Sequence, residues 1–332
     1  MKRRGFITLV GGRAVFWPVV ARTQQSPNKV WRVGYLFPGK SDGSAMMIFD
    51  GWKRALRERG YLEGQNLNVD RRFAENDFGR LPQLARDIVA TNPDIIVAVT
   101  TPAVAAAQGA TSTIPIVMAA IGDPIGSGFV KSLARPGGKI SGTANMTVDY
   151  MPKTIEILRE LLPAARRVAV LMSGNPVHPL MYRAIDAPAI ANGIDLLPVI
   201  AKTAADLDEA FSAISSLKAE AIIVFTDAVR IQIVGLAAAA KLPVIYQISN
   251  FVDAGGLISY GANAPALIWQ TASYIDKILR GADPAEVPVE QPTSSSSKLI
   301  SRRLVPCPWL FHPRYLLAPT KSSSSDFGCC AT

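Results

Sequence analysis

The chain has 332 residues, 49% of them hydrophobic and 18% charged, a balance typical of packed globular domains, and its length allows two domains of ordinary size. No apolar run reaches the roughly 20 residues that a membrane-spanning helix needs. The net charge of +9 resides in the ends, because residues 1–25 and 294–332 carry the excess and residues 26–293 are neutral overall, which argues against a nucleic-acid partner.

The first 25 residues are predicted to be an export signal. Lys2, Arg3 and Arg4 precede an apolar stretch that ends near small residues around position 21. Arg3-Arg4 followed by Phe6-Ile7 also fits the twin-arginine pattern, which is an address read by a receptor and not an anchor. The alternative is a frayed cytosolic N-terminus. We expect a periplasmic protein.

Between residues 30 and 281, short apolar runs alternate with amphipathic stretches, the pattern of parallel βαβ units. Gly60, Gly193 and Gly281 follow three of the predicted helices, where glycine commonly ends a helix. The predicted strands are 33–37, 67–73, 95–99, 116–119, 167–172, 194–199, 221–225, 243–246 and 257–260. The predicted helices are 44–59, 81–91, one that opens at Thr101-Pro102, 152–162, 179–192, 207–217, 229–240 and 265–279.

A loop rich in Gly and Pro interrupts the alternation near its middle. The pattern therefore predicts an α/β protein with two successive doubly wound parallel-sheet units. Residues 286–332 are predicted to be a crossover and an aberrant Ser-rich tail. Because periodicity ends at Ser294, we interpret the tail as frameshifted; a natural disordered tail is the alternative.

In open parallel sheets, ligands bind beyond the carboxyl ends of the strands. Polar and aromatic residues that follow or end the predicted strands are therefore candidates. Hydroxyls and amides suit a carboxylate, carboxylates suit an ammonium, and aromatic rings can stack on a ligand. Helix capping is the alternative role for the polar residues, and core packing for the tyrosines. The candidate ligand-binding residues are Ser41, Ser44, Thr100, Thr101, Asp123, Ser173, Asn175, Thr226, Asp227, Tyr246, Asn250 and Tyr260.

Residue types that support catalysis or metal binding are scarce. All three cysteines lie at or beyond position 307, and His178 and His312 are the only histidines. No P-loop, complete dinucleotide fingerprint or nucleophile elbow occurs in the sequence. We therefore expect no catalytic residue, metal or cofactor, and we expect a binding protein.

Four segments resemble motifs of a large bacterial family: 51–66, 121–124, 133–138 and 254–261. Together they are similar to the ABC transporter substrate-binding family with the type I periplasmic-binding fold. The resemblance covers residues 1–293. It implies two doubly wound parallel-sheet lobes joined by a hinge, with three crossovers, that close on a ligand. The first lobe would then comprise residues 26–145 and a return segment, 248–285, and the second lobe residues 146–247. It also implies an amino acid-like ligand, aromatic amino acids included, and delivery to the permease subunits of an ABC importer, with a monomer expected.

Family members continue past residue 293 into a strand and a helix that complete the second lobe, and this chain departs from that pattern at Ser294. A non-functional truncated copy is therefore one alternative. A ligand-sensing domain in signalling is another, although a DNA-binding helix-turn-helix is missing from the N-terminus. An enzyme on a doubly wound sheet is the third.

Overall fold

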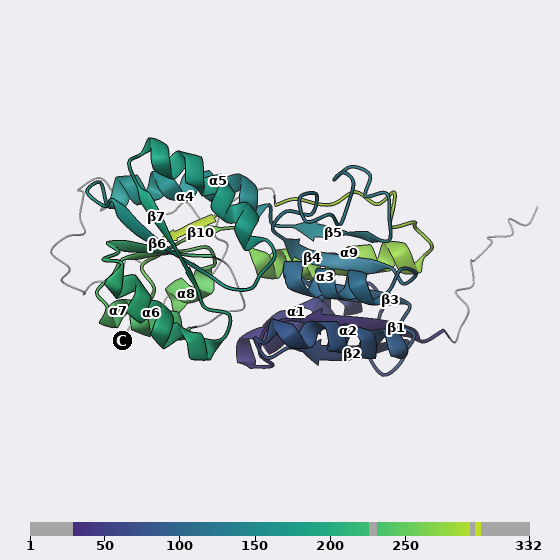
Figure 1. Ribbon diagram of the computed structural model, residues 1–332. Helices are drawn as coiled ribbons and strands as arrows, with labels where there is room; N and C mark the ends of the chain where they lie inside the picture. Colours follow the sequence, from purple (N-terminus) through teal and green to yellow (C-terminus); the bar gives the residue numbers. More distant parts are fainter. Residues whose placement is uncertain (1–28, 226–230, 293–295, 300–332) are drawn as a thin grey trace, which may run out of the picture.

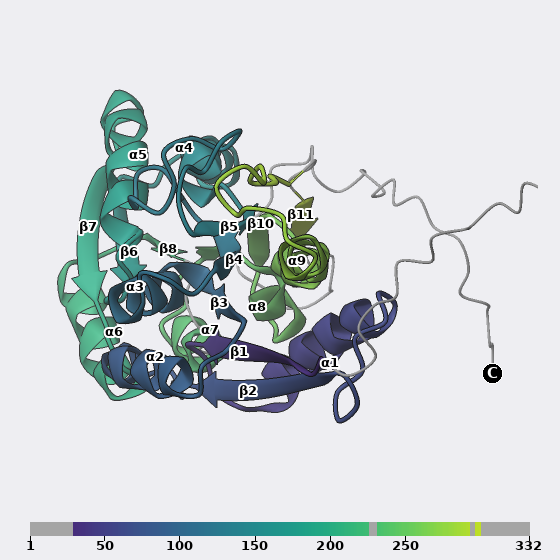
Figure 2. The same cartoon turned by 90° about the vertical axis from the view of Figure 1, so that its right-hand side faces the viewer.

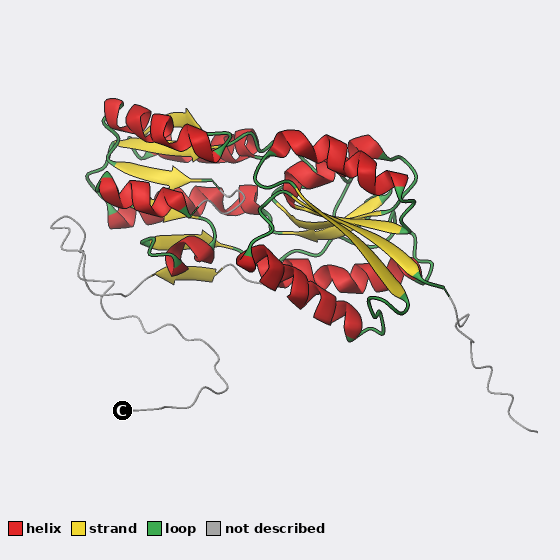
Figure 3. Ribbon diagram, turned by 90° about the horizontal axis from the view of Figure 1, so that it is seen from below, coloured by secondary structure: helices red, strands yellow, loops and turns green. Residues whose placement is uncertain are grey.

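The computed structural model describes residues 29–225, 231–292 and 296–299. The predicted export signal and the part of the tail beyond residue 299 lie outside the described residues. The described chain forms two α/β lobes that lie side by side (Figure 1). In each lobe, helices flank a twisted sheet (Figure 3).

The first lobe contains a parallel sheet with the strand order β2-β1-β3-β4-β5. Every residue of β3, β4 and β5 is buried, which explains the continuous apolar runs in two of these strands. The strands are β1 (Trp31–Phe37), β2 (Leu67–Phe73), β3 (Ile95–Val99), β4 (Ile116–Ile121) and β5 (Ile140–Ala144). The helices are α1 (Gly43–Arg57), η1 (Phe78–Arg80), α2 (Leu81–Ala90), α3 (Thr100–Ala110) and, from the return segment, α9 (Ala264–Leu279).

The second lobe contains a sheet with the order β11-β10-β9-β8-β6-β7, parallel except for the edge strand β11. Its parallel part repeats the order of the first lobe, so both lobes place their second strand at one edge. The strands are β6 (Arg167–Met172), β7 (Asp195–Ile200), β8 (Ala221–Val224), β9 (Val244–Tyr246), β10 (Ile258–Gly261) and β11 (Ser296–Leu299). The helices are α4 (Thr147–Leu161), α5 (His178–Ala191), η2 (Ala204–Asp206), α6 (Leu207–Ser216), α7 (Gln232–Ala239) and α8 (Ser249–Asp253).

In the described part of the chain, three passages connect the lobes, from β5 to α4, from β10 to α9 and from residue 290 to β11. In the second passage the chain returns to the first lobe, where α9 packs on α1, β4 and β5 (Figure 2). The predicted return at residue 248 is wrong, because α8 and β10 belong to the second lobe and β10 pairs with β9. Hydropathy predicted β9 and β10 as strands, but an apolar run does not show to which sheet its strand belongs.

Four other elements differ from the predictions. Helix α4 starts at Thr147, five residues before the predicted start at Pro152, which lies inside the helix. β5 and the short helix α8 were not predicted. Residues 296–299 of the supposedly aberrant tail form β11, antiparallel to β10.

Candidate functional site

The loops that follow the strands of one sheet lie opposite those of the other. Gly122, directly after β4, packs against Val177, which precedes α5. The turns after β1 and β2 share a pocket with the start of α7 and the end of α8. The carboxyl ends of both sheets therefore border one cleft between the lobes, where the rule for parallel sheets predicts a ligand.

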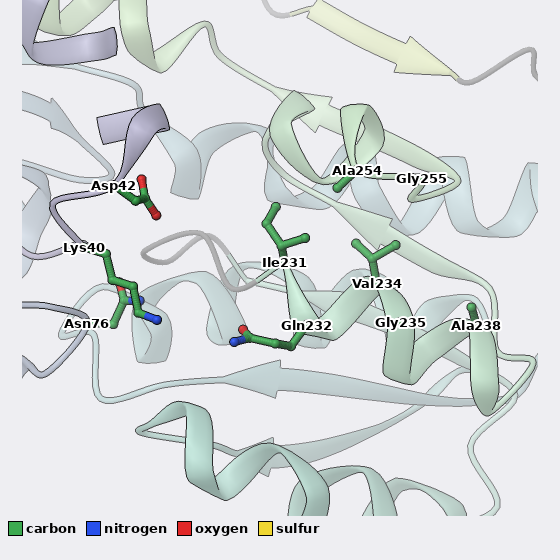
Figure 4. A pocket seen from close by; sticks show the side chains of 10 residues that line it. All are labelled: Lys40, Asp42, Asn76, Ile231, Gln232, Val234, Gly235, Ala238, Ala254 and Gly255. Carbon is green, nitrogen blue, oxygen red and sulfur yellow. The ribbon is translucent and has the colours of Figure 1, made fainter. Parts of the chain in front are cut away.

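A pocket with a volume of about 610 Å³ lies in this cleft (Figure 4), within the usual range for small-molecule sites. Its walls differ in polarity. The first lobe contributes Lys40, Asp42 and Asn76. The second lobe contributes Gln232 and otherwise apolar or small residues, namely Ile231, Val234, Gly235, Ala238, Ala254 and Gly255. Such a pocket suits a ligand with a charged end and an apolar body.

The polar wall is built from two turns whose local structure explains their residues. Asp42 Oδ1 accepts a hydrogen bond from the Ala45 N–H at 3.2 Å and so supports the start of α1. Asn76 has a φ of 65°, a left-handed conformation that asparagine tolerates. Lys40 is exposed, and no carboxylate pairs with it in the described ranges. Its ammonium group is therefore available to a carboxylate of a ligand.

The predicted site residues of the first lobe are spread over three loops. Ser41 donates from its N–H and its Oγ to Glu75 Oε1, at 3.1 and 2.8 Å, and thereby ties the β1 turn to the β2 turn. Thr100 starts α3 with a φ of 66°, and Thr101 is buried. Asp123 Oδ1 accepts a hydrogen bond from Gly126 N–H at 2.7 Å, so the carboxylate stabilises its own turn.

Asp123 also acts electrostatically on the second lobe. Burial, and then the Asp123 carboxylate, raise the pKa of Asp149 in the first turn of α4. Two carboxylates from different lobes thus lie near each other beside the first crossover.

The β6–α5 loop of the second lobe is held by its own polar side chains. Ser173 N–H donates to His178 Nδ1 at 3.0 Å, and Asn175 N–H donates to Ser173 Oγ at 3.1 Å. Val177 N–H donates to Asn175 Oδ1, also at 3.1 Å. His178 is buried, with its ring edge-to-face against Phe225. Ser173 and Asn175 therefore shape the loop that borders the cleft.

The two candidate tyrosines have different surroundings. Tyr246 is 1% exposed and stacks on Phe251 with a centroid distance of 4.6 Å, and burial raises the pKa of its hydroxyl. Its environment is the core of the second lobe. Tyr260 is half-buried and meets Tyr150 edge-to-face at 5.6 Å, beside the second crossover. Asn250 is half-buried in α8.

Thr226 and Asp227 lie outside the described residues, as does the side chain of Ser44 in α1. None of the described candidates lines the pocket, although Ser41 stands between Lys40 and Asp42. The sequence analysis missed four polar lining residues: Lys40, Asp42, Asn76 and Gln232. Lys40 and Asp42 could have been found from their position in the turn after β1. Asn76 lies in the loop after β2, from which the sequence analysis chose no candidate residue.

No helix in the described ranges is long and apolar enough to cross a membrane. The same ranges hold no group of three or more His, Cys, Asp or Glu residues arranged to bind a metal ion.

The sequence profile of the ABC transporter substrate-binding proteins matches residues 41–302. The chain belongs to this family. Its members bind substrates and are not enzymes. The resemblance was expected to end at residue 293, but the match extends past Ser294 and includes β11. The two doubly wound lobes with three connections are the type I periplasmic-binding fold.

Three relatives of this substrate-binding protein are informative. A tyrosine-binding protein of Clostridioides difficile (strain R20291) is 29% identical over 245 residues, 72% of this chain and 70% of the relative. A solved domain from Streptococcus pneumonia, in complex with L-Trp, is 25% identical with a TM-score of 0.73. The ligand-free, open structure of a substrate-binding protein with adhesive properties from Clostridium difficile is 27% identical with a TM-score of 0.57. Each of these two structural matches covers 82% of this chain and 92% of the other.

Proposed function

We propose that this protein is the extracytoplasmic receptor of an ABC importer, and that it captures an amino acid with a large apolar side chain between its lobes. Lobe closure would enclose the ligand, and the closed form would deliver it to the permease subunits. The N-terminal segment would direct export to the periplasm, in keeping with its basic and apolar regions.

The observation that carries this proposal is the asymmetric pocket between the lobes. Lys40 offers a cation to a carboxylate, and Asp42 offers an anion to an ammonium group. Ile231, Val234 and Ala238 offer apolar surface on the opposite wall. A free amino acid has both charges at one end and its side chain at the other, so it matches the two walls at once.

The relatives support the ligand class. One is named for tyrosine binding and another was solved with L-Trp. The arrangement of the lobes also resembles the L-Trp complex more than the open structure, although the open structure has the slightly higher sequence identity. A chain arranged to enclose a ligand is consistent with a receptor that works by closure.

A thermal-shift screen of the exported chain against L-Trp, L-Tyr, L-Leu, L-Asp, sugars and purines tests the proposal. A ligand at 100 times its Kd adds about 2.7 kcal/mol to the free energy of unfolding, which raises the melting temperature by a few degrees. We expect L-Trp or L-Tyr to do so and their D-enantiomers to have a much smaller effect. A cooperative melt that only a sugar or a purine shifts would contradict the proposed ligand class.

A further inference from the structure

Gly122 lies at a contact between the lobes, beside the first crossover. It follows β4 in the first lobe, and its carbonyl oxygen accepts a hydrogen bond from the Val148 N–H of α4 in the second lobe at 3.4 Å. A Cβ atom added to Gly122 would lie 2.8 Å from Val177 Cγ2 and 3.6 Å from Thr147 Cβ. Both of these residues belong to the second lobe. Only a hydrogen atom fits at this point between the lobes.

The backbone of Gly122 does not itself require glycine. Its φ is not among the positive values, so an alanine could adopt the same conformation. The restriction is therefore one of space alone, and it exists only while the lobes are held in this arrangement.

Val177 cannot readily make room. It is 4% exposed and belongs to a core cluster of the second lobe with Met151, Ile155 and Met181. Its N–H donates to Asn175 Oδ1, and its carbonyl accepts hydrogen bonds from the Leu180 and Met181 N–H groups. A β-branched side chain also has few alternative rotamers. A methyl group at position 122 would therefore push the lobes apart before it displaced Val177.

We propose that Gly122 is a positioning residue, whose missing side chain allows the lobes to close against each other at Val177. The role in ligand capture rests on the proposed function. The added methyl group raises the free energy of the closed arrangement and not that of the open one. It therefore lowers the closed population and weakens the binding of any ligand that requires closure.

The test compares Gly122→Ala with Gly109→Ala, a substitution in α3 whose Cβ would meet nothing within 4 Å. Isothermal titration with L-Trp and L-Tyr measures affinity, and urea unfolding shows that each variant is folded. We expect Gly122→Ala to bind about tenfold more weakly than the parent, the size of a modest overpacking penalty. Gly109→Ala should bind as the parent does.

A second substitution distinguishes a steric effect of the Gly122→Ala methyl group on the lobes from a direct contact of that group with the ligand. Val177→Ala makes room for the new methyl group, so Gly122→Ala/Val177→Ala should regain most of the parent affinity, while Val177→Ala alone stays near it. Parent-like binding by Gly122→Ala, or a double variant no better than the single one, would overturn the proposal.

If the parent binds neither amino acid, the proposed ligand class fails, and the ligand that the thermal-shift screen identifies takes their place in the same titrations. The expected order of affinities among the variants is unchanged, so the steric role is tested separately from the ligand class.

Discussion

Tyr246 ends β9 with its ring stacked on Phe251 inside the second lobe. Tyr246→Ala should therefore lower the free energy of unfolding by about 3–5 kcal/mol, as for other large aromatic core residues. Tyr246→Phe keeps the ring and should change stability little. Urea unfolding and ligand titration of both variants check this expectation. Loss of binding in a fully stable Tyr246→Phe would instead indicate that the hydroxyl contacts the ligand.

Glu220 links the starts of two strands in the second lobe. Its Oε2 accepts hydrogen bonds from the Arg166 and Arg167 N–H groups, at 2.5 and 3.0 Å, and these bonds hold the pKa of the carboxyl below its ordinary value. A lowered pKa means that the folded state favours the charged form. The stabilisation is present at neutral pH and is lost as pH falls below the ordinary glutamate range toward the lowered pKa.

Glu220→Gln should therefore lower stability at pH 7 by about 0.5–1 kcal/mol, after allowance for solvent screening of an exposed group. Melting curves of parent and variant at several pH values measure the difference. We expect the two curves to converge in acid, because the parent carboxyl then becomes protonated. A difference that stays constant down to pH 3 would show that charge is not its cause.

At the level of elements, α9 holds the return segment in the first lobe. The Trp52 Nε1–H donates to Thr271 Oγ1 at 3.1 Å, and the Trp269 Nε1–H donates to the Ile48 carbonyl at 3.1 Å. The two indoles thus bind α1 and α9 to each other from both sides. Since about 220 residues separate the partners in the chain, these contacts fix the second crossover by tertiary packing.

β11 is the element that the tail contributes to the second sheet. It pairs with β10 over four residues, from Ile258 opposite Leu299 to Gly261 opposite Ser296. A chain that ends after Thr293 should be less stable than the full chain by about 1–3 kcal/mol, since each cross-strand pair contributes a fraction of a kcal/mol or more. A chain that ends after Arg303 keeps β11 and serves as the control. Equal urea midpoints for the two truncations would contradict a structural role of β11.

At the scale of the whole molecule, the proposed binding site needs both lobes, since the pocket takes its polar wall from one and its apolar wall from the other. Lys40→Gln should weaken the binding of L-Trp or L-Tyr by about 3- to 30-fold, because it removes a charged contact. Gln232→Ala removes only an amide and should weaken binding less. Both side chains are exposed, so the melting temperature of the ligand-free protein should hardly change.

Lys139→Gln is the matched control for charge, because Lys139 is exposed at the opposite end of the sheet, before β5. Titration calorimetry distinguishes the variants. If Lys139→Gln weakens binding as much as Lys40→Gln does, the cause is the change in the protein's net charge and not the loss of a contact in the pocket.

The sequence predicted those strands in which every residue is both buried and apolar. β3 and β4 are buried at every residue and read as apolar runs. β5 is equally buried yet was missed, because Ser141 and Thr143 are polar. Ser141 Oγ donates to the Val287 carbonyl at 2.6 Å, and Thr143 Oγ1 donates to the Leu267 carbonyl at 3.0 Å. Both partners come from the distant return segment, so hydropathy could not reveal that these hydroxyls are satisfied in the core.

Periodicity and motifs are local properties of the chain, and they were enough to predict the fold class and the family. Tertiary structure alone decided which residues form the pocket. Lys40 and Gln232 meet only because three crossovers bring two lobes together, and the same packing made Tyr246 a core residue and left Gly122 without room for a side chain. Such contacts depend on how separate lobes are oriented, and no spacing along the chain encodes that orientation directly.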